Sequence, residues 1–142
     1  MINKIKRHFG QICSAYLFIL LCFAFLDAIW LGWLAVDSYQ SEMKGMLRDE
    51  FITWPWLVFY LMYGFVTMVL AVIANKQKPW FYASLDGALL GLAAYGAYNL
   101  TNYSILEGFS LTIMLTDWIW GTFLTACSAT AGWFGFCLFN QR

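Results

Sequence analysis

Charge is scarce in this sequence, and positive charge is missing where it would matter most. Only 11% of the 142 residues are charged, eight Lys and Arg balance eight Asp and Glu, and there are two prolines and one histidine. A net charge of zero offers no overall positive field, so we expect no nucleic-acid partner. No Lys or Arg falls within any long apolar stretch. Acidic residues in those stretches therefore have no cation on the same helix to pair with.

Metal and cofactor motifs are also missing. The four cysteines contain no C-x-x-C pair, and the single histidine, His8, lies in an N-terminal basic stretch. Metal sites built on Cys and His need several such ligands together, so we expect no metal and no cofactor. The sequence also lacks a zinc motif, a phosphate loop and a dinucleotide fingerprint. These absences exclude the common cofactor enzymes but leave acid–base chemistry open.

Hydrophobic residues dominate what remains. They make up 62% of the chain, and the mean hydropathy is +0.65, well above ordinary soluble composition. A membrane-spanning helix needs about 20 mainly apolar residues, and four stretches qualify, at 12–36, 54–74, 80–103 and 109–139. The first is too long for the roughly 7 to 15 apolar residues of a cleaved signal. The sequence predicts an all-α integral membrane protein, one domain over 1–142, folded as a bundle of four transmembrane helices.

The distribution of Lys and Arg predicts the orientation of the bundle. The side with the two termini and the second connection carries six, and the opposite side two: Lys4, Lys6, Arg7, Lys76, Lys78 and Arg142 against Lys44 and Arg48. Cytoplasmic loops are enriched in these residues. We therefore expect both termini in the cytoplasm and the acidic connection 37–53 outside, most simply in a bacterial inner membrane.

Three aspartates, Asp27, Asp86 and Asp117, lie within the apolar stretches. A carboxylate near the bilayer centre costs about 2.5 to 3.5 kcal/mol, so such residues usually face the bundle interior at a functional site. With a rise of about 1.5 Å per residue, Asp27 and Asp117 lie roughly 12 to 13 Å below the external surface. Asp86 lies near the opposite surface. We predict a polar pocket in the external half, formed by Asp27, Tyr98, Asn99, Thr101, Asn102 and Asp117, with Tyr63 as a further candidate.

Glycines at helical spacing predict the packing faces. Gly87 and Gly91 form a G-x-x-x-G pair in the third stretch, and Gly121 follows Asp117 by four residues in the fourth. Small residues at this spacing allow close helix contact in lipid. The same face could also support a homo-oligomer.

Three local patterns together resemble a bacterial membrane-protein family known as domain of unknown function 2177. They are Asp27-Ala-Ile-Trp30-Leu-Gly, Tyr98-Asn99-Leu-Thr101-Asn102 and Asp117-Trp-Ile-Trp120-Gly121. The resemblance covers nearly the whole chain and implies that Trp30 and Trp120 join the site. The family usually has an acid where this chain has Asn99. The family has no established activity, so the resemblance implies topology and site residues and not a reaction.

Several functions fit this pattern. Asp27 and Asp117 could carry protons or a small solute, as acidic residues do in many pumps. They could act as general acid and base on a membrane lipid, or the pocket could bind a lipid without catalysis in an accessory subunit. Purely structural hydrogen bonds between helices, worth about 0.6 kcal/mol each in membranes, are the remaining alternative. Transport is slightly favoured, and membrane lipid and a second copy are the expected partners.

Overall fold

The structure is a computed structural model that describes residues 2–43, 48 and 50–138. Throughout these residues the regular secondary structure is helical, with no strand. The predicted all-α class is therefore correct. Lys44, Asp49 and Arg142, whose charges enter the predicted orientation or the acidic connection, lie outside the described residues.

The first long helix begins earlier than predicted. Helix α1 covers Ile2–Ile29 and continues into a π-helical segment, η1, at Trp30–Leu34. The prediction started at residue 12 because only apolar residues were counted. Lys6 and Arg7 nevertheless extend the same helix, since both have good helix propensity.

The predicted connection 37–53 contains a helix that the sequence pattern did not indicate. Helix α2 covers Val36–Glu42. Tyr39 of this helix and Met43, which follows it, pack against a small buried cluster of Phe109, Ile113 and Met114. This packing, and not local propensity, stabilises a helix of only seven residues.

The helices that follow overlap the predicted stretches 54–74, 80–103 and 109–139. Helix α3 (Trp54–Thr67) has Pro55 in its first turn and continues through a π-helical segment, η2 (Met68–Val72), and a short 3₁₀ turn, η3 (Ile73–Asn75). Helix α4 covers Trp80–Ile105 and helix α5 covers Leu111–Leu138. Gly108, at φ 86°, forms the turn between them, a conformation that glycine adopts without strain.

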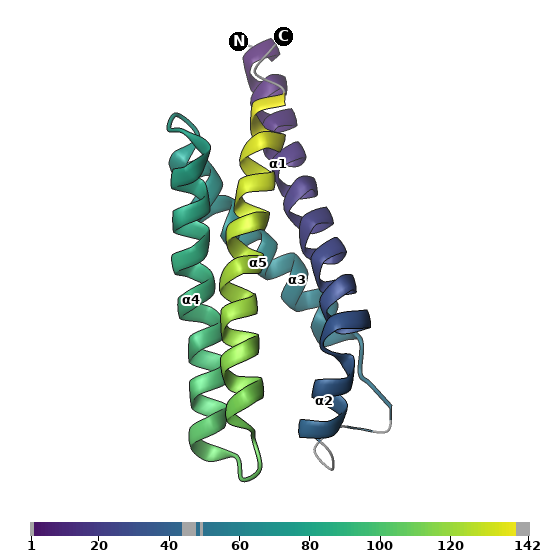
Figure 1. Cartoon of the computed structure of the whole chain (residues 1–142). Coiled ribbons are helices and arrows are strands. Elements are labelled where there is room, and N and C mark those ends of the chain that lie inside the picture. The colour runs from purple at the N-terminus through teal and green to yellow at the C-terminus, as the bar shows by residue number, and fades with distance from the viewer. Residues whose placement is uncertain (1, 44–47, 49, 139–142) are drawn as a thin grey trace.

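Helices α4 and α5 lie side by side as an antiparallel pair, with α1 against α5 and α3 crossing obliquely (Figure 1). A Cβ on Gly91 would lie 2.6 Å from the Gly121 carbonyl oxygen, and one on Gly87 would lie 2.6 Å from the Ala129 Cβ. A Cβ on Gly121 would overlap the Tyr95 ring. The glycine face is therefore used within the chain, between α4 and α5. It is not available for an oligomer.

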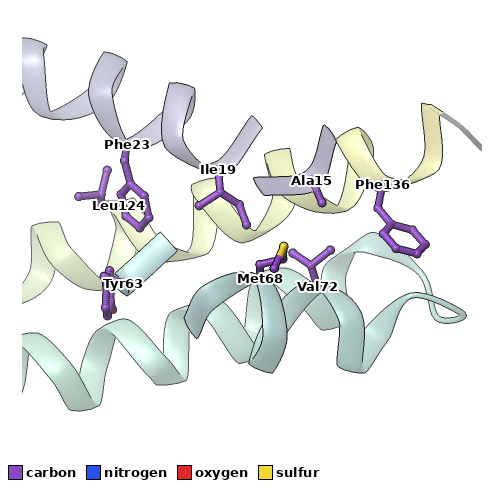
Figure 2. Close-up of a cluster of buried hydrophobic side chains, with 8 residues drawn as sticks. All are labelled: Ala15, Ile19, Phe23, Tyr63, Met68, Val72, Leu124 and Phe136. Atoms are coloured by element: carbon purple, nitrogen blue, oxygen red, sulfur yellow. The ribbon is translucent and has the colours of Figure 1, made fainter. Parts of the chain in front are cut away.

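Side chains from α1, α3, η2 and α5 form the main core (Figure 2). Ile19, Val72 and Leu124 have no exposed surface, and Phe23 has 1%. Tyr63 packs on Phe23, with ring centroids 5.7 Å apart. This core holds α1 and α3 against the α4–α5 pair, toward the middle of the bundle.

Large apolar side chains also cover the outside of the fold. Two segments, Lys6–Trp33 and Trp54–Asn75, are long and apolar enough to cross a membrane, with a mean hydropathy of 2.3 each. Within the most apolar 18 residues of each segment, only 22% and 33% are buried. Most of this apolar surface therefore faces outward. Soluble monomers rarely expose apolar patches of this extent. The described surface suits a lipid environment.

Candidate functional site

Asp27 lies near the end of α1 with only 9% of its surface exposed. One carboxyl oxygen accepts a hydrogen bond from the Tyr60 hydroxyl of α3, at 2.6 Å. The other accepts one from the Trp120 indole N–H of α5, at 3.0 Å. Asp27 therefore joins three helices, and both donors are neutral.

Asp117, near the start of α5, has a matching arrangement. The Tyr39 hydroxyl of α2 donates to one oxygen at 2.6 Å, and the Asn99 side-chain amide of α4 donates to the other at 2.6 Å. The same amide nitrogen also donates to the Tyr95 carbonyl at 3.0 Å. Asn99 is fully buried, and its Oδ1 has no hydrogen-bond partner. Each carboxyl thus accepts one phenol and one N–H donor.

The two carboxyls line one cavity of about 170 Å³. The remaining lining is Leu31 and six aromatic side chains, Trp30, Trp56, Phe59, Tyr60, Tyr95 and Trp120. Trp30 and Trp120 stack in parallel, with centroids 4.5 Å apart and an interplanar angle of 7°. The Trp30 indole N–H is buried without a partner at hydrogen-bond geometry. The result is an acidic cavity with aromatic walls.

Among the described residues, no Lys, Arg or His lines this cavity, and no three His, Cys, Asp or Glu side chains cluster as metal ligands would. Tyr39 sits on α2, at the edge of the site. Burial, and then the negative charge of Asp117, raises the pKa of its phenol well above the usual range. Tyr39 therefore remains a hydrogen-bond donor at neutral pH.

Several predicted residues lie elsewhere. Tyr98 is 57% exposed and Thr101 is also exposed, and neither lines the cavity. Asn102 is half-buried but does not line the cavity. The Tyr63 hydroxyl pairs with the Thr125 hydroxyl at 3.1 Å, outside the cavity lining. Of the predicted set, Asp27, Trp30, Asp117 and Trp120 line the cavity, and Asn99 supports it from behind.

Asp86 lies apart from these residues. Its carboxylate accepts a hydrogen bond from the Asn75 side-chain amide at 2.5 Å. Asn75 is itself buried and also donates to the Ala71 carbonyl. The hydrogen bond between Asn75 and Asp86 therefore joins α4 to η3.

The site also includes residues that the sequence analysis did not select. Tyr39, Tyr60 and Tyr95 either donate to a carboxyl or line the cavity. Tyr95 precedes Asn99 by four residues, which places it on the same face of α4. That spacing could have identified Tyr95 as a site residue. Spacing gives no such indication for Tyr39, because Tyr39 lies in a connection with no periodic pattern.

The helical fold, the outward apolar surface and the buried carboxyls together define a helical membrane protein. The family model of domain of unknown function 2177, described as a predicted membrane protein, matches residues 12–134. The chain belongs to this family. No curated protein and no solved structure matches the chain.

Proposed function

We propose that this protein binds a small organic cation between Asp27 and Asp117 and moves it across the bacterial inner membrane in exchange for protons. The chain would cross the membrane four times, with both termini in the cytoplasm and the cavity in the external half. Helices α4 and α5, at 26 and 28 residues, exceed the roughly 20 that a span requires. Membrane lipid and a second copy of the chain are its proposed partners.

One observation carries this proposal: two carboxyls and six aromatic side chains line a single cavity, and none of the described residues that line it is basic. An ammonium group held over aromatic faces gains about 0.5 to 2 kcal/mol or more, most when water is excluded. Carboxylates add the opposite charge that such a ligand needs. A phosphate or carboxylate ligand would instead meet like charge and no basic partner.

Proton exchange follows from the same arrangement. When the cation leaves, two carboxyls in a low-dielectric cavity cannot easily both stay ionised, so a proton must replace it. Binding of the cation then releases that proton. Because the hydrogen-bond donors to Asp27 and Asp117 are neutral, only the ligand or a proton neutralises the pair.

The test uses the full chain in proteoliposomes that contain a pH-sensitive dye. A gradient of tetramethylammonium is imposed, because this ion has no neutral form that leaks through lipid. We expect native protein to move protons against the ion, and Asp27→Asn or Asp117→Asn to abolish this exchange. Asp86→Asn is the matched control, an Asp on a predicted span that lies outside the cavity. A native protein that behaves like empty liposomes would contradict the proposal, as would full exchange by either cavity variant.

General acid–base chemistry on a lipid is the second candidate. It is favoured by an open apolar groove that also reaches Asp27. The lipids extracted from cells lacking the protein can be compared with those of cells carrying the native chain, Asp27→Asn or Asp117→Asn at matched expression. A lipid species that requires both carboxyls would support enzyme action in place of transport.

A further inference from the structure

A second and larger hollow adjoins the acidic cavity. It lies between α1 and α3 and has a volume of about 590 Å³, within the range of about 300–1,000 Å³ typical of small-molecule sites. Six Leu and Ala side chains and Gly32 form most of its wall. Its only polar side chains are Asp27 and Tyr60, the hydrogen-bonded pair that also borders the smaller cavity.

The two hollows therefore share three lining residues, Asp27, Leu31 and Tyr60. One side of this boundary is aromatic and acidic, and the other is aliphatic. A ligand that matches both sides has a cationic head and a hydrocarbon chain. The groove is open on helices whose outward surface is largely apolar. A chain can therefore enter sideways from a bilayer without first crossing water.

We propose that the cation is amphiphilic: an ammonium head occupies the cavity between Asp27 and Asp117, and a single hydrocarbon chain lies in the α1–α3 groove. This inference rests on the proposed function and names its substrate class. The lining of the two hollows also excludes phospholipids that carry the same ammonium head, because these lipids bring a phosphate group. Among the described residues, no Lys, Arg or His lines either hollow, so the phosphate of such a lipid would be desolvated without a partner.

Gly32 provides a variant that blocks the chain and leaves the acidic cavity intact. A Cβ added at Gly32 would meet nothing within 4 Å, so Gly32→Phe extends into open space without straining the backbone. Gly32 lines the groove but not the smaller cavity. Leu89→Phe is the matched control, because Leu89 is 55% exposed on α4, outside the groove.

Binding is measured by calorimetry on the full chain in nanodiscs, with empty nanodiscs subtracted. The probes are dodecyltrimethylammonium below its micellar concentration, tetramethylammonium as the head alone, and dodecyl sulfate as the chain with opposite charge. We expect the native protein to bind dodecyltrimethylammonium about tenfold tighter than tetramethylammonium, a difference of about 1.4 kcal/mol. Gly32→Phe should remove this advantage and leave tetramethylammonium binding unchanged. Leu89→Phe should behave as native.

The outcomes separate this inference from the function on which it rests. Tetramethylammonium exchange with equal affinities for the long-chain and short ions would overturn the amphiphile and retain the transporter. So would a Gly32→Phe variant that binds the long-chain ion as tightly as native. Dodecyl sulfate binding as tight as that of the ammonium would overturn the charge match. No binding of either ammonium would overturn both proposals.

Discussion

Trp30 and Trp120 stack face to face at 4.5 Å, yet only Trp120 donates to a carboxyl of the site. The Trp120 N–H donates to Asp27, whereas the Trp30 N–H is buried without a partner. The stack brings together the segment after α1 and the middle of α5. The two rings thus provide a matched pair in which stacking is shared and hydrogen bonding is not.

Replacing Trp120 should therefore cost more than replacing Trp30. Trp120→Phe keeps an aromatic ring but leaves one Asp27 oxygen without its donor, and we expect a loss of about 0.6 to 1.7 kcal/mol in unfolding free energy from the hydrogen bond. Trp30→Phe loses ring area but no hydrogen bond to a carboxyl. Unfolding of both variants in mixed micelles compares them directly. Equal losses would show that the Trp120 contact to Asp27 contributes nothing.

The hydrogen bond from Tyr39 to Asp117 should hold α2 against the bundle over a wide pH range. Because its pKa is raised by burial and then by Asp117, its stabilising contribution is fully present below the unfolded value of about 10 and is lost only as pH rises above that. Tyrosinate absorbance of Tyr39→Phe, subtracted from that of native protein, gives the titration of this residue. A Tyr39 that titrates near the unfolded value of about 10 would contradict the buried hydrogen bond.

Asn99→Asp introduces an acid beside Asp117 and should make stability depend on pH. The Asn99 amide donates to Asp117 at 2.6 Å, but an acid at that position can donate only while protonated. We expect the variant to approach native stability at acidic pH and to lose stability as pH rises, when two carboxylates face each other. Asn102→Asp, on a half-buried residue outside the cavity, is the control. Parallel pH profiles for native and Asn99→Asp would refute this prediction.

Gly91→Ala should separate α4 from α5. Its methyl would meet the Gly121 carbonyl oxygen at 2.6 Å and the Thr122 Cα at 2.9 Å, and backbone cannot move aside as a flexible side chain does. We expect a loss of about 1 to 3 kcal/mol in unfolding free energy, as for other overpacked cores. Gly32→Ala, in open space, should change it little. A stable Gly91→Ala variant would mean that the pair packs less closely.

The helices and the glycine face were predictable because they rest on period and length. Gly87, Gly91 and Gly121 are small residues at helical spacing, and such spacing has one common use in lipid. Counting residues also predicted that Asp27 and Asp117 lie close together, and both line one cavity. Local pattern was sufficient for these features.

The rest of the site depends on how each helix is rotated, which spacing alone leaves open. Neighbouring helical residues point about 100° apart, so while Asn99 faces α5, Tyr98 is 57% exposed and does not line the cavity. Tyr95, one turn earlier, faces inward. Tyr39 could not be predicted because α2 is held by contacts with residues near 109–114, far along the sequence. Tertiary packing therefore determines the position of Tyr39, which the sequence pattern does not indicate.

The Tyr39 hydrogen bond also gives the connecting segment a second role. Helix α2 is attached to the bundle partly through the carboxyl of Asp117, so anything that occupies or protonates this acid also weakens what holds α2. Protease cleavage near Met43 would then report on the state of the Asp117 carboxyl. The rate of cleavage in this connecting segment would therefore indicate whether Asp117 is occupied.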